Sequence, residues 1–505
     1  MTLPDSILTA LRRGPGGDPA RFLQAAGQAL SAGQASAVAS AMADATVTAP
    51  GEPRFWQFLG LAQRALQDSA GANQSFANAA RLAPEDPLIA HSEARSALEA
   101  GYPALAAFNR ARLLAPGDGS VVLGRVAAML AESHGQRACE QLANLLAASP
   151  GWTEGHIALA RLTAQVDPGQ PIDASLRQAL AAHPQAGALW QTRFQVLMEA
   201  RDFAAAAGAA DEARGLLGPS QELDRVEAIC RSELGDAAAA QTVFDSLPFP
   251  HDGAAAIWPI RNFIRLGRYA DAILLAEQRF DAASEAVLWP YRALLWRLLD
   301  DPRWQWLEND PRLIQSYDIG AASGSLERLA TVLRSLHRAQ AAPLDQSVRG
   351  GTQTDGNLLA RAEPELRQLR SALLDAVQDY VGQLPAFDPA HPMLLARREP
   401  LAVAGAWSVR LSDRGFHADH VHAQGWISSA CYITVPPADP ALPEGGWLAF
   451  GECRDLLPDL AAFRTEAPSP GKLVLFPSIM WHGTRPFGSG ERMTVAFDIA
   501  RPPQA

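Results

Sequence analysis

The sequence predicts an α-solenoid of helical hairpins followed by a β domain of the jelly-roll type. Three observations support this fold class. Up to about residue 290 the chain is rich in alanine, with apolar residues at helical spacing and short breaks at proline or glycine. Prolines recur there at a nearly constant interval. From about residue 400 the pattern changes to short runs of alternating or β-branched residues between glycines and prolines, which is typical of strands.

The proline spacing marks a sequence repeat. Pro84, Pro116, Pro150 and Pro184 each follow a short amphipathic run and lie 32, 34 and 34 residues apart. This is the period of tetratricopeptide repeats, which are pairs of antiparallel helices. Residues 53–86 carry the fullest copy of the pattern, with Trp56, Leu59, Gly60, Ala72, Phe76, Ala79 and Pro84 at the expected offsets.

Residue types in this copy have physical reasons. Small residues such as Gly60 and Ala72 let two helices approach closely, and bulky Trp56 and Phe76 fill the space beside them. Proline ends the second helix because it has no N–H to donate. Stacked hairpins of this kind form a concave surface, for which a protein or peptide is the usual ligand.

The chain is expected to divide into three parts. Residues 1–300 form the tetratricopeptide-like domain, residues 301–345 a linker or packing segment, and residues 346–505 the jelly roll. Within the last part, residues 346–354 predict a strand or loop and residues 364–384 a helix. Four tryptophans between residues 289 and 306 are expected to pack the end of the solenoid against the next domain, because acidic residues and prolines lie among them.

Composition excludes several functions. With 54 acidic and 43 basic residues the formal charge is −11, which argues against binding to nucleic acid. Lys472 is the single lysine, so Schiff-base chemistry and a Walker-type phosphate loop are improbable, and anions must be bound mainly by arginine. The four cysteines form no CxxC, and no stretch is long and apolar enough to span a membrane. We therefore expect a cytoplasmic protein with no membrane partner.

Histidines cluster in the segment GFHADHVHAQGW, where His417, His420 and His422 fall within six residues of one another. Beside Asp419 they offer several metal donors at little cost in chain entropy. Two pairs compete, His417 with Asp419 and His420 with His422. Along a strand the members of each pair share a face, and the two pairs lie on opposite faces, so in an unbroken strand they cannot both face one metal ion. Spacing alone leaves the choice open.

A third histidine and an arginine follow in PGKLVLFPSIMWHGTRPFGSGERMTVAFDI. His482 comes directly after a predicted strand, and Arg492 and Thr494 begin the next one. With the donor cluster and the GGWLAF strand, this order resembles the 2-oxoglutarate/Fe(II)-dependent oxygenases over residues 345–500. The similarity is greatest to the bacterial and phage group with an H-x-H motif before the central strand.

The resemblance favours the second histidine pair and implies a site. His420, His422 and His482 would bind Fe(II), in place of the usual two histidines and one carboxylate, and Arg492 and Thr494 would hold 2-oxoglutarate. The implied reaction consumes O2, with ascorbate as an auxiliary reductant. We expect a dioxygenase that hydroxylates a protein or peptide recruited on the concave face of the repeats. The alternatives are a small-molecule oxygenase whose repeats serve assembly, and a non-catalytic scaffold with a degenerate barrel.

Overall fold

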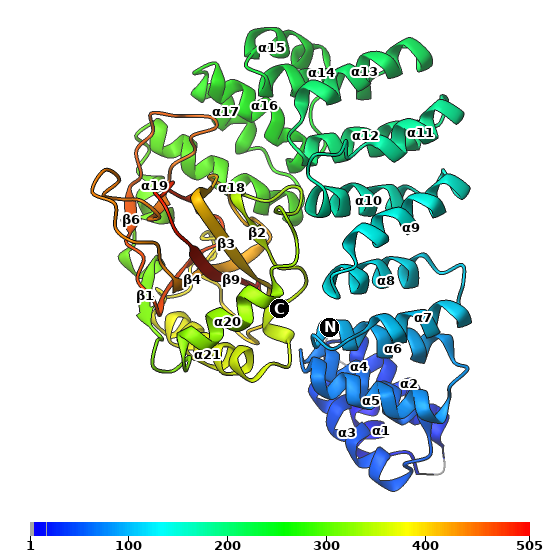
Figure 1. Cartoon of the computed structure of the whole chain (residues 1–505). Coiled ribbons are helices and arrows are strands. Elements are labelled where there is room, and N and C mark those ends of the chain that lie inside the picture. The colour runs from blue at the N-terminus through cyan, green and yellow to red at the C-terminus, as the bar shows by residue number, and fades with distance from the viewer. Residues whose placement is uncertain (1–4, 17, 505) are drawn as a thin grey trace. The chain divides into compact units, whose positions relative to one another are not determined.

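Helical hairpins occupy the chain as far as Leu298 in the computed structural model, which describes residues 5–16 and 18–504 (Figure 1). The chain divides into two compact units, one made of residues up to 138 with residues 356–367, the other of residues 139–355 and 368–504. The helices of the first unit are α1 (Asp5–Arg13), α2 (Pro19–Ser31), α3 (Ala35–Thr48), α4 (Pro53–Ala65), α5 (Ser69–Leu82), α6 (Pro87–Glu99), α7 (Leu105–Leu114) and α8 (Gly119–Ala131), and α9 (Gly135–Ala148) spans the division.

The hairpins continue in the second unit. Its helices before the sheet are α10 (Thr153–Val166), α11 (Ala174–Ala182), α12 (Gly187–Glu199), α13 (Phe203–Leu217), α14 (Gln221–Glu233), α15 (Ala237–Ser246), α16 (Gly253–Arg265), α17 (Tyr269–Ala276), α18 (Ala282–Leu298) and α19 (Arg303–Glu308). Successive hairpins stack side by side in this part of Figure 1. Within the described residues, no helix is both long enough and apolar enough to cross a bilayer.

The periodic prolines end helices, as predicted. Pro84, Pro116, Pro150 and Pro184 each lie two residues beyond the last residue of a helix, after α5, α7, α9 and α11 respectively. The next helix begins soon afterwards. Two of these helices, α6 and α8, begin with an aspartate cap. In α6 the carboxylate of Asp86 accepts hydrogen bonds from the backbone N–H groups of residues 88 and 89. This punctuation repeats the hairpin along the chain.

The close helix approach predicted at Gly60 is also present. A Cβ at Gly60 would lie 2.9 Å from ring atoms of Phe76, which is fully buried between α4 and α5. Gly124 in α8 faces Phe108 of α7 in the same way. A glycine on one helix facing a phenylalanine on a neighbouring helix therefore sets the distance between these helices in the first unit.

The C-terminal region forms two antiparallel sheets. The larger has the strand order β1-β7-β4-β9-β3-β2, and the smaller has the order β6-β5-β8. Two antiparallel sheets that follow a helical repeat array in the chain are the predicted fold class. The strands are β1 (Gln315–Asp318), β2 (Val348–Gln353), β3 (Val403–His417), β4 (Gly425–Thr434), β5 (Leu448–Phe450), β6 (Arg464–Glu466), β7 (Lys472–Pro477), β8 (His482–Thr484) and β9 (Arg492–Ala500). Helices α20 (Leu326–Leu336) and α21 (Pro364–Gln383) and the short 3-10 helices η1 (Pro311–Leu313) and η2 (Leu358–Ala360) complete the elements.

The larger sheet takes one strand from the segment predicted as a linker. Strand β1 pairs with β7 through residues 315–318, so its backbone lies at one edge of the sheet. The three-part division at residues 300 and 345 stays a prediction.

The last helices of the array share a hydrophobic core with the β region. Buried residues of α16 and α18, among them Ile260 and Tyr291, form one cluster with Cys453, Leu456 and Trp481. The indole Nε1 of Trp481 donates to the carbonyl oxygen of Pro290, at 3.1 Å. Since Trp481 precedes a candidate site histidine, the helices help to fix that part of the site.

The tryptophans at the end of the array also pack as predicted. Trp296 is 4% exposed and shares a small core with Ala293, Leu307 and Ile479. The ring of Trp304 lies edge-on to Phe463, with centroids 5.6 Å apart. These rings fill the space between helices α18 and α19 and the β region.

Candidate metal centre

Three histidine side chains meet where the two sheets approach each other. Strand β3 ends at His417, and the chain then runs without regular structure to β4, carrying His420 and His422. His482 opens β8, and its backbone pairs with that of His420 through two hydrogen bonds of 2.9 and 3.0 Å. One ring nitrogen from each of His420, His422 and His482 lies within 4.8 Å of the others.

Hydrogen bonds orient the three rings. The Nδ1 atom of His420 lies 2.8 Å from the carbonyl oxygen of residue 418, and that of His482 lies 2.9 Å from the carbonyl oxygen of residue 480. Nδ1 of His422 lies 2.6 Å from Oδ2 of Asp498. Because each Nδ1 has an acceptor as its partner, it carries the proton, and Nε2 of each ring is left with a lone pair.

Burial keeps His420 and His482 uncharged. It lowers the pKa of His420 to about 3, with the neighbouring His422 acting in the same direction. The pKa of His482 is also well below its usual range, first because of burial and then because of the other two rings. Neutral imidazole is the form that binds metal ions, so His420 and His482 are in the binding form at neutral pH.

Asp419 is not brought into the cluster. Both of its carboxylate oxygens are engaged by Arg454, whose Nη2 lies 2.5 Å from Oδ1 and whose Nε lies 2.7 Å from Oδ2. The Asp419 side chain is 3% exposed and that of Arg454 is 32% exposed, so the ion pair is partly buried. The carboxylate of the alternative pair therefore has a cationic partner outside the histidine cluster.

His417 does lie beside the cluster, which the alternation argument excluded. It lines the same pocket as His420, His422 and His482, and its ring stacks on that of His420 with centroids 6.1 Å apart. Strict alternation failed because β3 ends at His417, so the residues that follow are not in a strand. The hydroxyl of Ser347 lies 3.0 Å from Nδ1 of His417 and 3.3 Å from Nε2 of His420.

A buried arginine faces the same pocket from β9. Arg492 is 1% exposed, and within the described residues no carboxylate forms an ion pair with it. Its Nε and the hydroxyl of Tyr432 are buried without a hydrogen-bond partner, and its Cζ lies 5.1 Å from the Tyr432 ring centroid. A buried guanidinium without a counter-ion is costly, so this place suits an anion. Thr494, also buried, lines the same pocket.

The sequence analysis missed three polar residues of this region, Asp498, Tyr432 and Ser347. For Asp498 a signal was present. Residues 492, 494, 496 and 498 alternate along β9, so a carboxylate in phase with Arg492 falls on the face that carries the arginine. No local signal marks Ser347 or Tyr432. Ser347 lines the pocket from the loop before β2, and Tyr432 of β4 lies beside Arg492.

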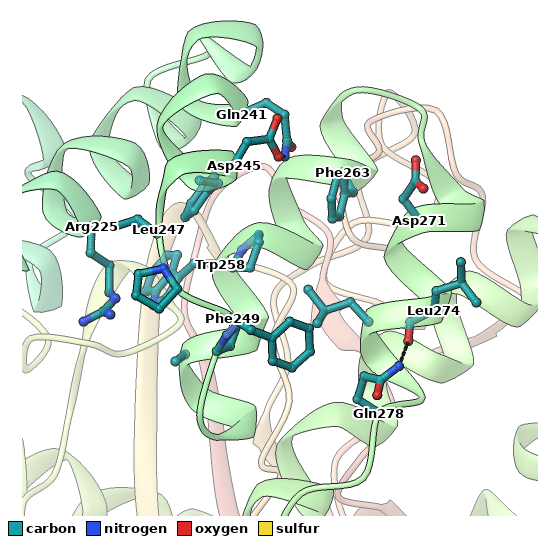
Figure 2. Close-up of a pocket in the computed structure, with 16 residues that line it drawn as sticks. Arg225, Gln241, Asp245, Leu247, Phe249, Trp258, Phe263, Asp271, Leu274 and Gln278 are labelled. Atoms are coloured by element: carbon teal, nitrogen blue, oxygen red, sulfur yellow. Dashed lines mark hydrogen bonds between the residues drawn. The ribbon is translucent and has the colours of Figure 1, made fainter. Parts of the chain in front are cut away.

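A second cavity lies away from the histidines, among helices α14 to α17 (Figure 2). Its volume is about 490 Å³, within the range of small-ligand pockets. The walls are mainly apolar, from aromatic, proline and leucine side chains. Figure 2 shows Phe249, Trp258 and Phe263 around the cavity, with Arg225 and Asp245 near its margin. Phe249 is 65% exposed, so the cavity has an apolar mouth at the surface.

Comparison with known proteins identifies the β region. Residues 405–498 match the family described as "Putative 2OG-Fe(II) oxygenase". This range contains the three histidines, Arg492, Thr494 and Asp498. No curated protein matches the chain.

Three solved structures show weak similarity. A tetratricopeptide repeat protein from Parabacteroides merdae is 14% identical and matches over 48% of this chain and 92% of its own, with a TM-score of 0.29. A collagen prolyl hydroxylase from Paramecium bursaria Chlorella virus-1, in complex with 2-oxoglutarate, is 12% identical over 38% of this chain and 98% of its own, at 0.27. A prolyl-4-hydroxylase from Pseudomonas putida is 16% identical over 41% and 98%, also at 0.27.

These scores are too low to support an argument about function, so the assignment depends on the family match and on the order of site residues within it. The resemblance predicted from the sequence is confirmed. Residues 405–498, which follow a long array of helical hairpins in the chain, match the 2OG-Fe(II) oxygenase family.

Proposed function

We propose that the chain is an Fe(II)- and 2-oxoglutarate-dependent dioxygenase that hydroxylates a protein or peptide recruited by its helical repeats. One observation carries the proposal. Three histidines whose ring nitrogens come together line the same pocket as a fully buried arginine that has no counter-ion among the described residues. A metal ion and an anion bound side by side would satisfy both groups.

The donor set fits a metal of this class. Imidazole nitrogen is a good ligand for Fe(II), and His420, His422 and His482 would hold the ion on one side and leave positions open on the other. When bound, Fe(II) and 2-oxoglutarate supply the oxidation of a C–H bond by O2. The protein's part is to bind, orient and exclude water.

Arg492 would hold the far carboxylate of 2-oxoglutarate. Its guanidinium offers a planar pair of donors, Thr494 adds a hydroxyl two residues on, and both side chains are buried. Leu448 and Phe476 form apolar walls of the same pocket. These walls keep water from competing for the arginine and strengthen its attraction for a carboxylate.

A protein or peptide substrate is supported by the repeats. Arrays of helical hairpins present extended surfaces to such partners, and the concave face is the proposed place of recruitment. The apolar cavity of Figure 2 offers an exposed mouth where a substrate side chain could be buried. The alternatives are a small-molecule substrate with the repeats serving assembly, and a scaffold without catalysis.

Anaerobic titration followed by exposure to air tests the proposal. The wild-type chain should bind one Fe(II), then bind 2-oxoglutarate, and release succinate when O2 is admitted in the presence of ascorbate. Arg492→Gln should weaken 2-oxoglutarate binding by about 30-fold or more with metal stoichiometry unchanged, because a charge-assisted pair is lost. Arg410→Gln, on the neighbouring strand β3 with an exposed pair to Glu491, is the matched control.

The outcomes separate the three functions. Absence of metal binding and of turnover would leave only the scaffold. Succinate formation that rises with a peptide library, but not with free amino acids, supports a peptide substrate. A rise with amino acids or other small molecules alone supports the small-molecule oxygenase.

A further inference from the structure

One of the three site histidines has a charged partner. Nδ1 of His422 lies 2.6 Å from the carboxylate oxygen Oδ2 of Asp498, whereas Nδ1 of His420 and of His482 each face a neutral backbone carbonyl. The His422 and Asp498 side chains are 21% and 14% exposed, so water screens the pair only partly.

Asp498 is itself held in place on the sheet. It pairs with Ser428 across strands β4 and β9, and the Ser428 hydroxyl lies 2.6 Å from its second oxygen, Oδ1. Ser428 Oγ lies 2.9 Å from Ser478 Oγ, and the backbone N–H of His422 donates to the carbonyl oxygen of Ser478. The carboxylate, the ring and the backbone of His422 thus belong to one connected network.

We propose that Asp498 is a positioning residue for the metal centre. It fixes the ring of His422 with Nε2 turned towards the pocket, and it places one negative charge directly behind a ligand. This inference depends on the proposed function, since it assumes that His422 binds the metal.

The charge has a particular use at this site. In a set of two histidines and one carboxylate, the carboxylate contributes one negative charge beside the ion. Here the three donors that come together are all histidines, with no carboxylate among them, and the nearby Asp419 is paired with Arg454. Asp498 supplies this negative charge from behind the His422 ring. Its hydrogen bond with Nδ1–H makes the imidazole a stronger ligand for the metal.

Two substitutions of Asp498 separate its effect on the position of the His422 ring from the effect of its negative charge. Asp498→Asn keeps the shape and an oxygen that can accept from His422, but removes the charge. Asp498→Ala removes both. Asp413→Asn is the matched control, because Asp413 accepts from the backbone of Gly490 and none of its recorded contacts is with a histidine.

The probe is Co(II) added anaerobically to the full chain, with binding followed by visible absorption. Outer partners of ligand histidines commonly change metal affinity by 10- to 100-fold, so Asp498→Ala should weaken Co(II) binding by about that factor. Asp498→Asn should fall between it and the wild type, and Asp413→Asn should match the wild type. Circular dichroism and the melting temperature show that each variant is folded.

Proton NMR of the Co(II)-loaded chain gives a readout that a purely structural role would not change. The three Nδ1–H protons should appear as strongly shifted, solvent-exchangeable signals. Asp498→Ala should lose one of them to exchange, because the His422 ring is partly exposed, and should keep the two held by backbone carbonyls. Asp498→Asn should shift that same signal and leave the others in place.

The results distinguish this inference from the proposed function. Asp498→Ala with wild-type affinity and all three signals unchanged would overturn the role of Asp498 while leaving the metal site intact. A wild-type chain that does not bind Co(II), or a His482→Ala variant that binds it as well as the wild type, would overturn the metal site, and the role of Asp498 with it.

Discussion

Asp419 and His420 are adjacent in the sequence, yet their side chains have different partners. His420 joins the other two histidines, and Asp419 pairs with Arg454, 35 residues further along the chain. Which of the two belongs to a metal site depends on Arg454, and no local pattern around residue 419 contains that information.

Metal stoichiometry tests this difference. We predict that His420→Ala abolishes stoichiometric binding of Fe(II), because one of three donors is lost. Asp419→Asn should retain the metal while lowering stability by about 1–2 kcal/mol, since the partly exposed Arg454 loses its nearest partner and keeps only the more distant Glu452. Iron analysis after anaerobic gel filtration measures the first effect and urea unfolding the second. Loss of iron in Asp419→Asn alone would restore the carboxylate as the ligand.

Glu308 predicts a pH dependence of stability. It is 5% exposed, and burial raises its pKa from 4.5 to about 7, although Trp304 donates to it and Arg297 is nearby. The folded protein therefore holds this proton more tightly than the unfolded chain does. Its contribution to stability is full below pH 4.5, declines as the pH rises towards 7, and is constant above that.

Glu308→Gln should remove this decline, because the amide accepts from Trp304 without a charge. We predict that the difference in unfolding free energy between the variant and the wild type shifts in favour of the variant by on the order of 3 kcal/mol when the pH is raised from 4 to 8. Urea unfolding at both pH values measures the difference. A difference between the two proteins that does not change with pH would contradict the prediction.

At the scale of elements, hairpin spacing depends on individual glycines. Gly60→Ala would place a methyl group 2.9 Å from the buried ring of Phe76, which has no room to move. Overpacking costs about 1–3 kcal/mol, and the gain in helix propensity offsets up to about 1 kcal/mol. We predict a net loss of about 1–2 kcal/mol, measured by chemical unfolding.

Gly27→Ala is the matched control, because Gly27 lies in helix α2 and its nearest foreign atom would be 3.8 Å from the new Cβ. It should leave stability unchanged or raise it by up to about 1 kcal/mol. Equal effects of the two substitutions would show that Phe76 does not limit the spacing.

Elements with a strong local signal could be predicted, and the others could not. The prolines, the apolar spacing of the helices and the β-branched runs of β4, β7 and β9 are local features. The strand Gln315–Asp318 reads QSYD and the strand His482–Thr484 reads HGT. Neither has an apolar alternation, and each is a strand only because a partner strand lies beside it.

The same distinction applies to the site. His420, His422, His482, Arg492 and Thr494 could be singled out because they stand in a recognisable order along the chain. Asp498 was overlooked, although its phase on β9 pointed to it. Ser347 could not have been found, because its place beside His417 follows from the pairing of β2 with β3.

At the scale of the whole molecule, the last helices of the array and the β region of the second unit share one hydrophobic core. The core around Tyr291 contains Trp481, next to His482, and Val421, between His420 and His422, packs against it. Both segments that carry the site histidines therefore pack against helices from the repeat array.

A chain truncated to residues 346–505 should consequently fail to form the site. We predict that it shows no cooperative thermal transition and does not bind Co(II), whereas a chain of residues 139–505 does both. Circular dichroism and metal titration of the two truncated chains test this. A cooperative fold with wild-type affinity in residues 346–505 would show that the shared core is dispensable.

Trp407 gives the site a signal of its own. Its indole ring lies beside His422, with centroids 5.5 Å apart and planes inclined by 34°. An ion with unpaired electrons bound at His422 would quench the emission of this indole at short range. Occupancy could then be followed in the unlabelled chain by intrinsic fluorescence, and the difference between the wild type and Trp407→Phe would isolate this one residue among the twelve tryptophans.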